Sequence, residues 1–176
     1  KNAYAKLVKE GACERMSASR IHMVGKLLGG AEGEICARTL AKGETPEWRQ
    51  AGWALLGDCL EKRSAYTESI DAYRKCLAEP VQTEEAAAAA LKLGKLEARN
   101  GEFGKSDETL KKAIALNEAN ARVRAEAYLA LAKNAGERDD WASAVAYATV
   151  VTSLFDDPGI CAEAKKIIEA HPEAKE

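Results

Sequence analysis

Hydrophobic positions recur every three or four residues over long stretches of the chain, which is typical of amphipathic α-helices. Breaks are rare, because the 176 residues include only 4 prolines and 13 glycines. Side chains that favour a helix N-cap stand where five of these stretches begin: Thr45, Thr83, Asn120, Asp140 and Asp157. Pro46 and Pro158 follow two of them, in the first turn where proline is tolerated. The pattern therefore predicts an all-α fold.

The two ends of the chain differ from its middle. Helical patterns cover 3–8, 21–28 and 33–42, with a break at Gly29-Gly30. We interpret 16–45 either as a degenerate helix pair or as an ordinary helical lead-in. At the other end, the stretch 159–170 has its isoleucines on one face and its charges on the other. It predicts a last helix that covers the exposed side of the preceding pair, and His171-Pro172 ends it.

Three segments share one internal spacing. Ten residues separate Leu56 from Tyr66, and seven separate Tyr66 from Tyr73. The same two intervals recur in Leu93, Phe103 and Leu110, and again in Leu131, Trp141 and Ala148. Small residues occupy matching places: Gly57, Gly94 and Ala132 before the turn, and Ser69, Ser106 and Ala144 after it. Each segment is thus predicted to be a helix, a turn and a helix, with small residues where the backbones approach and the aromatic residue after each turn between the helices.

These segments resemble the tetratricopeptide repeat (TPR) family, whose unit is 34 residues long. The units fall at 50–83, 87–120 and 125–158, and the extra residues 84–86 and 121–124 lengthen the first helix of the following unit. The chain then divides into a lead-in or degenerate repeat (1–49), three units (50–83, 84–120, 121–158) and a capping helix with a tail (159–176). The third unit has Ala132 where the family usually keeps glycine. The resemblance implies a right-handed superhelix (α-solenoid) of stacked antiparallel helix pairs.

The resemblance also implies a function, a non-catalytic protein–protein interaction scaffold. In the family, the first helices of successive units line a concave groove that takes a peptide or a partner helix. Ten residues of this chain match groove positions: Ala54, Asp58, Glu61, Lys62, Leu91, Lys95, Arg99, Leu129, Lys133 and Glu137. The alternative is a solvated helix face that binds nothing in particular. If the groove is used, we expect partner binding to be lost when Lys95 and Arg99 become Glu.

One known use of the groove is disfavoured. Relatives that grip the acidic C-terminal tail of heat-shock chaperones place Lys, Arg and Asn at five positions. Those positions here hold Ala54, Asp58, Lys92, Glu126 and Ala130. Four of the five are unsuited to a carboxylate, so we do not expect a chaperone-tail binder.

Composition and charge narrow the range of partners. Alanine accounts for 35 of the 176 residues and aromatics for only 6%, which fits helices packed closely through small side chains. The net charge of −2 provides no basic field for nucleic acid. The charge is uneven, however, with +4 over residues 1–29 and −5 over 125–176. It supports an alternative in which the chain is an architectural segment of a larger bacterial assembly or envelope protein, and self-associates as a homo-oligomer through complementary ends.

No constellation of catalytic or metal-binding residues is recognisable. The five cysteines, Cys13, Cys36, Cys59, Cys76 and Cys161, form no CxxC pair and are interpreted as small apolar core residues. His22 and His171 are interpreted as a boundary residue and a helix-end residue. We therefore expect no enzyme activity, no metal, no cofactor and no membrane span. The compartment stays open, and a chain that begins at Lys1 rather than Met is expected to be a trimmed or mature form.

Overall fold

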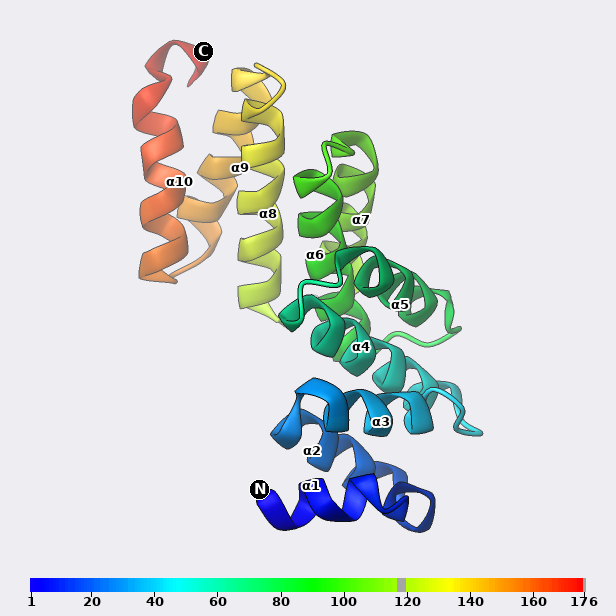
Figure 1. Ribbon diagram of the computed structural model, residues 1–176. Coiled ribbons are helices and arrows are strands. Elements are labelled where there is room, and N and C mark those ends of the chain that lie inside the picture. Colours follow the sequence, from blue (N-terminus) through cyan, green and yellow to red (C-terminus); the bar gives the residue numbers. More distant parts are fainter. Residues whose placement is uncertain (117–119, 176) are drawn as a thin grey trace. The chain divides into compact units, whose positions relative to one another are not determined.

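The computed structural model describes residues 1–116 and 120–175 (Figure 1). These residues form ten α-helices and two short 3₁₀ segments. The α-helices are α1 (Asn2–Lys9), α2 (Ala18–Leu28), α3 (Gly30–Leu40), α4 (Pro46–Lys62), α5 (Tyr66–Ala78), α6 (Glu84–Arg99), α7 (Phe103–Leu116), α8 (Ala121–Gly136), α9 (Trp141–Leu154) and α10 (Pro158–Ala170). The 3₁₀ segments are η1 (Ala12–Arg15) and η2 (Pro172–Lys175). The predicted helix end at Leu116-Asn117 reaches Asn117, which lies outside the described residues.

The chain divides into two compact units, unit 1 (Lys1–Ala89) and unit 2 (Ala90–Glu176), with the division inside α6. In unit 1 each helix from α2 to α5 packs against the next, and α1 and η1 lie against α3. In unit 2 each helix from α7 to α10 packs against the next, and α10 also contacts α8. Within each unit consecutive helices run antiparallel, so the predicted all-α arrangement of helix pairs is confirmed.

Small residues lie where the paired helices cross, as the repeat pattern predicts. A Cβ atom added at Gly57 would collide with the ring of Tyr73, and one added at Gly94 would lie 2.7 Å from Leu110. A serine tightens each of these crossings by donating its hydroxyl to the glycine carbonyl. Ser69 Oγ lies 2.9 Å from Gly57 O, and Ser106 Oγ lies 2.7 Å from Gly94 O. The third pair has fully buried alanines at the equivalent places, Ala132, Ala144 and Ala148.

The role assigned to the aromatic residue after each turn is only partly confirmed. Tyr66, Phe103 and Trp141 are each half-buried rather than enclosed between their helices. The fully buried residues lie seven positions later, where Tyr73 and Leu110 are 0% exposed. The reason is geometric: the residue at a helix start lies at the rim of the pair, whereas two turns further along the helix reaches the crossing point.

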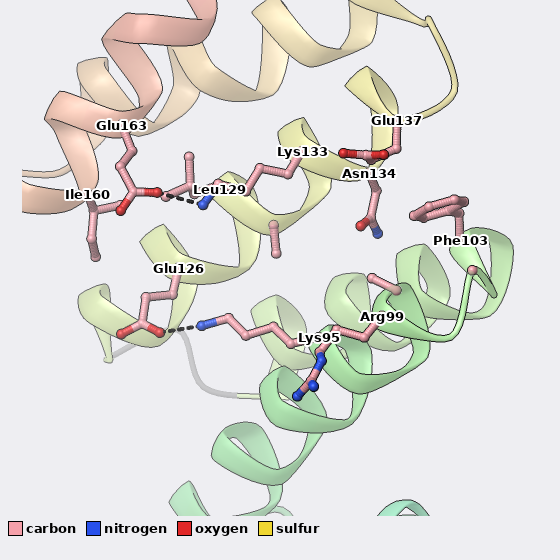
Figure 2. A pocket seen from close by; sticks show the side chains of 13 residues that line it. Lys95, Arg99, Phe103, Glu126, Leu129, Lys133, Asn134, Glu137, Ile160 and Glu163 are labelled. Carbon is pink, nitrogen blue, oxygen red and sulfur yellow. Dashed lines mark hydrogen bonds and ion pairs between the residues drawn. The ribbon is translucent and has the colours of Figure 1, made fainter. Parts of the chain in front are cut away.

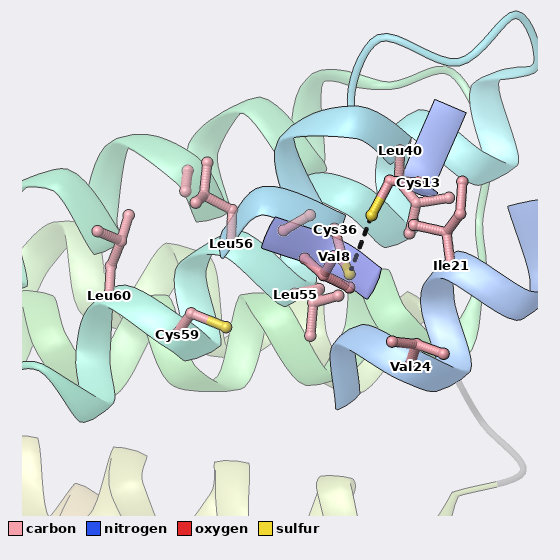
Figure 3. Packing of buried hydrophobic residues seen from close by; sticks show 12 residues of the cluster. Val8, Cys13, Ile21, Val24, Cys36, Leu40, Leu55, Leu56, Cys59 and Leu60 are labelled. Atoms are coloured by element: carbon pink, nitrogen blue, oxygen red, sulfur yellow. Dashed lines mark hydrogen bonds between the residues drawn. The ribbon is translucent and has the colours of Figure 1, made fainter. Parts of the chain in front are cut away.

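The core of unit 1 contains aliphatic side chains and three cysteines (Figure 3). Val8, Ile21, Val24, Leu40 and Leu55 surround the thiols of Cys13, Cys36 and Cys59, and Tyr4, Trp48 and Trp53 pack against this cluster from its edge. The cysteines thus occupy core positions, as the sequence pattern predicts. In unit 2, a smaller cluster joins α8, α9 and α10 through Leu129, Ala132, Ala148, Val151 and Ala164.

Most of the predicted helix starts are confirmed, and the caps explain them. Asn120 accepts a hydrogen bond from Val123 N (3.1 Å), Asp140 from Ser143 N (3.1 Å), and Asp157 from Gly159 N and Ile160 N. Thr83 accepts from Ala86 N at 3.3 Å. Thr45 differs from the prediction: it stands at the N-cap of α4, but its side chain makes no capping hydrogen bond. There Pro46 at the first helical position favours the helix start, because proline provides the helical φ without a donor.

The extra residues at 84–86 and 121–124 do lengthen the following helices, since α6 begins at Glu84 and α8 at Ala121.

Among the first 45 residues, Gly29 separates α2 from α3 with a positive φ of 63°. The two helices pack closely at Gly25, where an added Cβ would lie 2.9 Å from the Cβ of Cys36. Whether this pair is a degenerate repeat stays a prediction.

Tyr73 makes the stability of unit 1 sensitive to alkaline pH. Its phenol donates to Asp58 Oδ1 (2.7 Å) and also lies 2.9 Å from Glu61 Oε2. Burial and these two carboxylates raise the pKa of Tyr73 far above its usual value. In the unfolded chain Tyr73 loses its proton near pH 10, while the folded protein keeps it. The unfolded state therefore binds fewer protons above pH 10, and stability falls as pH rises.

We expect the wild type to lose about 1.4 kcal/mol of unfolding free energy per pH unit above pH 10, beyond the loss seen in Tyr73→Phe. Urea titrations of both proteins between pH 9 and 11 measure the difference, and the other tyrosines and the lysines cancel in the comparison. Parallel pH profiles would contradict the expectation.

Candidate partner-binding groove

A cavity of about 760 Å³ opens in unit 2 between α6, α8 and α10 (Figure 2). Its size suits several side chains of a bound segment rather than a single ion. Residues of all three helices and of the turn before α7 line it: Lys95, Ala98, Arg99, Gly101, Phe103, Glu126, Leu129, Ala130, Lys133, Asn134, Glu137, Ile160 and Glu163.

The interior of the cavity is apolar. Leu129 is only 7% exposed, and the half-buried Ala98, Phe103, Ala130 and Ile160 complete the surface. Two of these five residues are alanines, because the small-residue pattern of α6 and α8 leaves little side-chain volume here. The cavity therefore offers apolar area that an entering side chain would remove from water.

Charged residues line the rim in pairs that join neighbouring helices. Lys95 Nζ of α6 lies 2.6 Å from Glu126 Oε2 of α8, and Lys133 Nζ of α8 lies 2.5 Å from Glu163 Oε2 of α10. In Figure 2 both lysine side chains extend across the opening to reach these carboxylates. Arg122 adds a second contact to Glu126, at 3.2 Å. These exposed pairs contribute little stability, so a partner's charged groups can exchange with them at small cost.

The lysines also influence the protonation of the rim. The hydrogen bond from Lys133 lowers the pKa of Glu163. Burial tends to raise the pKa of Glu126, but the bonds from Lys95 and Arg122 outweigh it and lower this pKa overall. Both carboxylates are consequently charged near neutral pH, and the rim alternates in sign.

A hydrogen-bond network supports one end of the cavity. Asn134, which is 3% exposed, donates to Ser106 Oγ (2.7 Å) and to Asp107 Oδ1 (2.8 Å). Arg138 reaches the other oxygen of Asp107 at 2.6 Å. These contacts hold α8 against α7, and they thereby fix the position of the α8 residues that line the cavity.

Half of the predicted groove residues come together here. Lys95, Arg99, Leu129, Lys133 and Glu137 line the cavity. Leu91 is buried at 6% exposure and does not line it.

The other four predicted groove residues lie on α4 in unit 1. There Asp58 and Glu61 contact the phenol of Tyr73. Ala54 is half-buried and Lys62 is exposed. The groove assignment as a whole stays a prediction.

The sequence interpretation missed the residues that come from outside the first helices of the three units. Ile160 and Glu163 belong to α10, which was assigned only a covering role, and Phe103 was assigned to the space inside its own pair. The 30 residues between Lys133 and Glu163 come within one of the 31 between Lys95 and Glu126. That recurrence was the available signal for a rim that continues onto α10.

Neither histidine contributes to this cavity. His22, in unit 1, is half-buried edge-on against Trp48, with ring centroids 6.1 Å apart. Burial, and then the nearby Lys26, lower the pKa of His22. His171 follows α10 and stacks on Trp141 at 3.6 Å. Across residues 1–116 and 120–175, no three His, Cys, Asp or Glu side chains gather as a metal site would require.

The fold resembles that of helical-repeat proteins of the TPR type. Solved structures agree with this assignment. Two structures of MamA match 98% and 99% of this chain, and 88% and 84% of their own chains, with TM-scores of 0.59 and 0.60 at 19% and 18% identity. The Hsp90 co-chaperone Cns1 from Saccharomyces cerevisiae matches 76% of this chain with a TM-score of 0.64 at 19% identity. The match spans 42% of the Cns1 chain.

These neighbours are TPR proteins, so the resemblance inferred from the repeat spacing is confirmed at the level of the fold. No protein-family model and no curated protein sequence matches the chain. Proteins with this fold generally mediate protein–protein interactions, and they are typically not catalysts. Within the described part of the chain, no helix is both long and apolar enough to cross a membrane.

Proposed function

We propose that this protein is a non-catalytic scaffold that binds a segment of a partner protein in the cavity between α6, α8 and α10. One observation carries the proposal: five residues that the resemblance to the TPR family assigns to a binding groove line one cavity with an apolar interior. Partner segments of TPR-like folds are peptides or helices, and a volume of about 760 Å³ admits several of their side chains.

The lining favours an amphipathic segment. Apolar side chains of the partner would lie over Leu129 and Ala130, where they lose water-exposed area. Its charged side chains would meet a rim of alternating sign, with Lys95 and Lys133 beside Glu126 and Glu163. Such alternation contributes more to the register and specificity of binding than to affinity.

The rim does not suit a free carboxylate terminus. Glu126 and Ala130 occupy two of the positions where chaperone-tail binders place basic or amide side chains, and both line the cavity. Because Glu126 lies 2.6 Å from Lys95, an incoming carboxylate would meet a like charge beside the lysine. The likeness to an Hsp90 co-chaperone therefore supports the fold and not its ligand.

The proposal is tested by a charge reversal at the rim. Lys95→Glu/Arg99→Glu should reduce recovery of the partner at least tenfold, because the α6 side of the rim becomes acidic and repels the acidic side chains that it would otherwise bind. The measurement is affinity capture from source cells, quantified by mass spectrometry against wild-type bait. Circular dichroism of the variant should be unchanged, because both side chains are exposed.

The matched control is Lys111→Glu/Lys112→Glu on α7, which makes the same change of charge at exposed residues away from the cavity. A second variant, Ala130→Gln, fills the cavity without changing charge and should also reduce recovery, while Ala146→Gln on α9 should not. If all four variants recover the partner as well as the wild type does, the partner does not bind in this cavity. The association of complementary chain ends stays a prediction from the charge distribution.

A further inference from the structure

Two buried thiols of unit 1 lie in contact. The Sγ atoms of Cys13 in η1 and Cys36 in α3 are 3.6 Å apart, and the residues are 2% and 0% exposed (Figure 3). They are 23 positions apart in the sequence and belong to elements that pack against each other. The thiols of the protein are free in this structure. A disulfide requires an S–S distance of about 2.05 Å, so the two sulfurs need to approach by roughly 1.5 Å.

We propose that Cys13 and Cys36 are a site of disulfide formation, which links the N-terminal segment α1–η1 covalently to α3. The sequence alone argued against a disulfide framework, because the cysteines are odd in number and widely spaced. That argument concerns a set of several disulfides. It does not apply to one disulfide between two cysteines that the fold brings into contact.

The chemistry requires an oxidant with a disulfide bond, such as a low-molecular-weight disulfide or a disulfide oxidoreductase. The thiolate of one cysteine attacks a sulfur of the oxidant, which forms a mixed disulfide and releases one thiol. The thiolate of the second cysteine then attacks the protein sulfur of that bond. The products are the Cys13–Cys36 disulfide and two thiols, so the two cysteines lose two electrons and the oxidant gains them.

The folded core slows this exchange. Burial, and then the contact with Cys13, raise the pKa of Cys36 to about 12, so its thiolate is scarce in the closed structure. Local opening of the segment α1–η1 away from α3 would expose both sulfurs. We therefore expect oxidation to occur through the opened segment, and the finished bond to be protected once the segment packs again.

Cys59 is the competing partner in the same core. Cys59 Sγ lies against α3 at Gly33, where an added Cβ would come within 2.9 Å of it, whereas the close sulfur contact joins Cys13 and Cys36. Cys76 and Cys161 lie outside the cluster and have no role in the bond.

The test uses the full chain, incubated with oxidised glutathione in low urea, then denatured and alkylated. We expect three alkylated cysteines instead of five by intact mass, and a cross-linked tryptic pair of 10–15 with 27–38, the peptides that contain Cys13 and Cys36. The thermal midpoint of the oxidised protein should rise by about 5 °C or more, and dithiothreitol should reverse the rise. Five alkylated cysteines at every glutathione ratio, or a cross-link that contains Cys59, would overturn the proposal.

Single substitutions make the assignment specific. Cys13→Ala should leave all four remaining thiols open to alkylation and abolish the rise in midpoint, as should Cys36→Ala. The matched control Cys76→Ala removes another buried thiol and should still protect two of its four cysteines. Because Cys13 lies in a short 3₁₀ segment and not in a long helix, Cys13→Ala tests the pairing even if Cys36→Ala impairs folding. Protection of two cysteines in Cys13→Ala would also refute the pairing.

Discussion

Replacing Tyr73 with alanine should destabilise unit 1 by about 4 kcal/mol. Tyr73 is 0% exposed, and its ring packs on the backbone at Gly57, where no side chain is present to fill the space that it leaves. Removing the ring opens a cavity at the crossing of α4 and α5, and it also takes the hydroxyl away from Asp58 and Glu61. Because small domains have only about 5–15 kcal/mol of stability, this loss is a large fraction of the total, and the urea midpoint should fall clearly.

Urea unfolding followed by circular dichroism measures this effect, together with the two matched variants. Tyr73→Phe keeps the ring and loses only the hydroxyl, so it should cost about 1 kcal/mol. Tyr66→Ala removes a half-buried ring from the same helix and should cost much less than Tyr73→Ala. If alanine at the two positions proves equally costly, the crossing at Gly57 does not depend on the buried ring.

Gln50→Leu is expected to destabilise unit 1 by about 3 kcal/mol, although leucine is apolar and similar in size. The side chain of Gln50 is 0% exposed and joins α4 to the segment between α5 and α6. Its amide donates to Cys76 O (3.1 Å) and Val81 O (2.9 Å), and its oxygen accepts from the Thr83 hydroxyl (2.6 Å). Leucine leaves these groups without the partner that replaced water, which is the costly case for buried polar atoms.

The control is Gln82→Leu, at an exposed position of the same connection, which should change stability by no more than about 0.5 kcal/mol. Equilibrium unfolding in urea separates the two variants. Hydrogen exchange would add local detail, since faster exchange at 79–83 in Gln50→Leu is expected if the amide holds this connection in place. A Gln50→Leu protein as stable as the control would show that water or neighbouring groups replace the amide.

The sequence identified the elements well because their signals are local. A proline in the first turn, a capping side chain or a regular apolar spacing acts within a few residues, so the starts of α4, α6, α8, α9 and α10 could be read directly. Gly57 and Gly94 were also predictable as crossing points, since their intervals to Tyr73 and Leu110 are the same in two segments. The burial of Gln50 could not be predicted, because nothing in the neighbouring sequence indicates that this polar side chain faces the core.

The candidate site was predictable only in part, for the same reason. Lys95, Arg99 and Lys133 were assigned to the groove by the resemblance to the TPR family. Their partners do not, because the pairing of Lys133 with Glu163 depends on where α10 packs. Phe103 reaches the cavity, although its place in the repeat suggested a role inside the helix pair.

The amino-acid sequence by itself determined that this protein is an all-α array of helix pairs with small residues at their crossings, because helix periodicity, capping and glycine placement are properties of short segments. Only the tertiary structure decided which of those helices enclose a cavity, which lysine meets which carboxylate, and that Cys13 contacts Cys36. Such contacts join residues 23 to 31 positions apart. They depend on the packing of whole helices, which no single segment encodes.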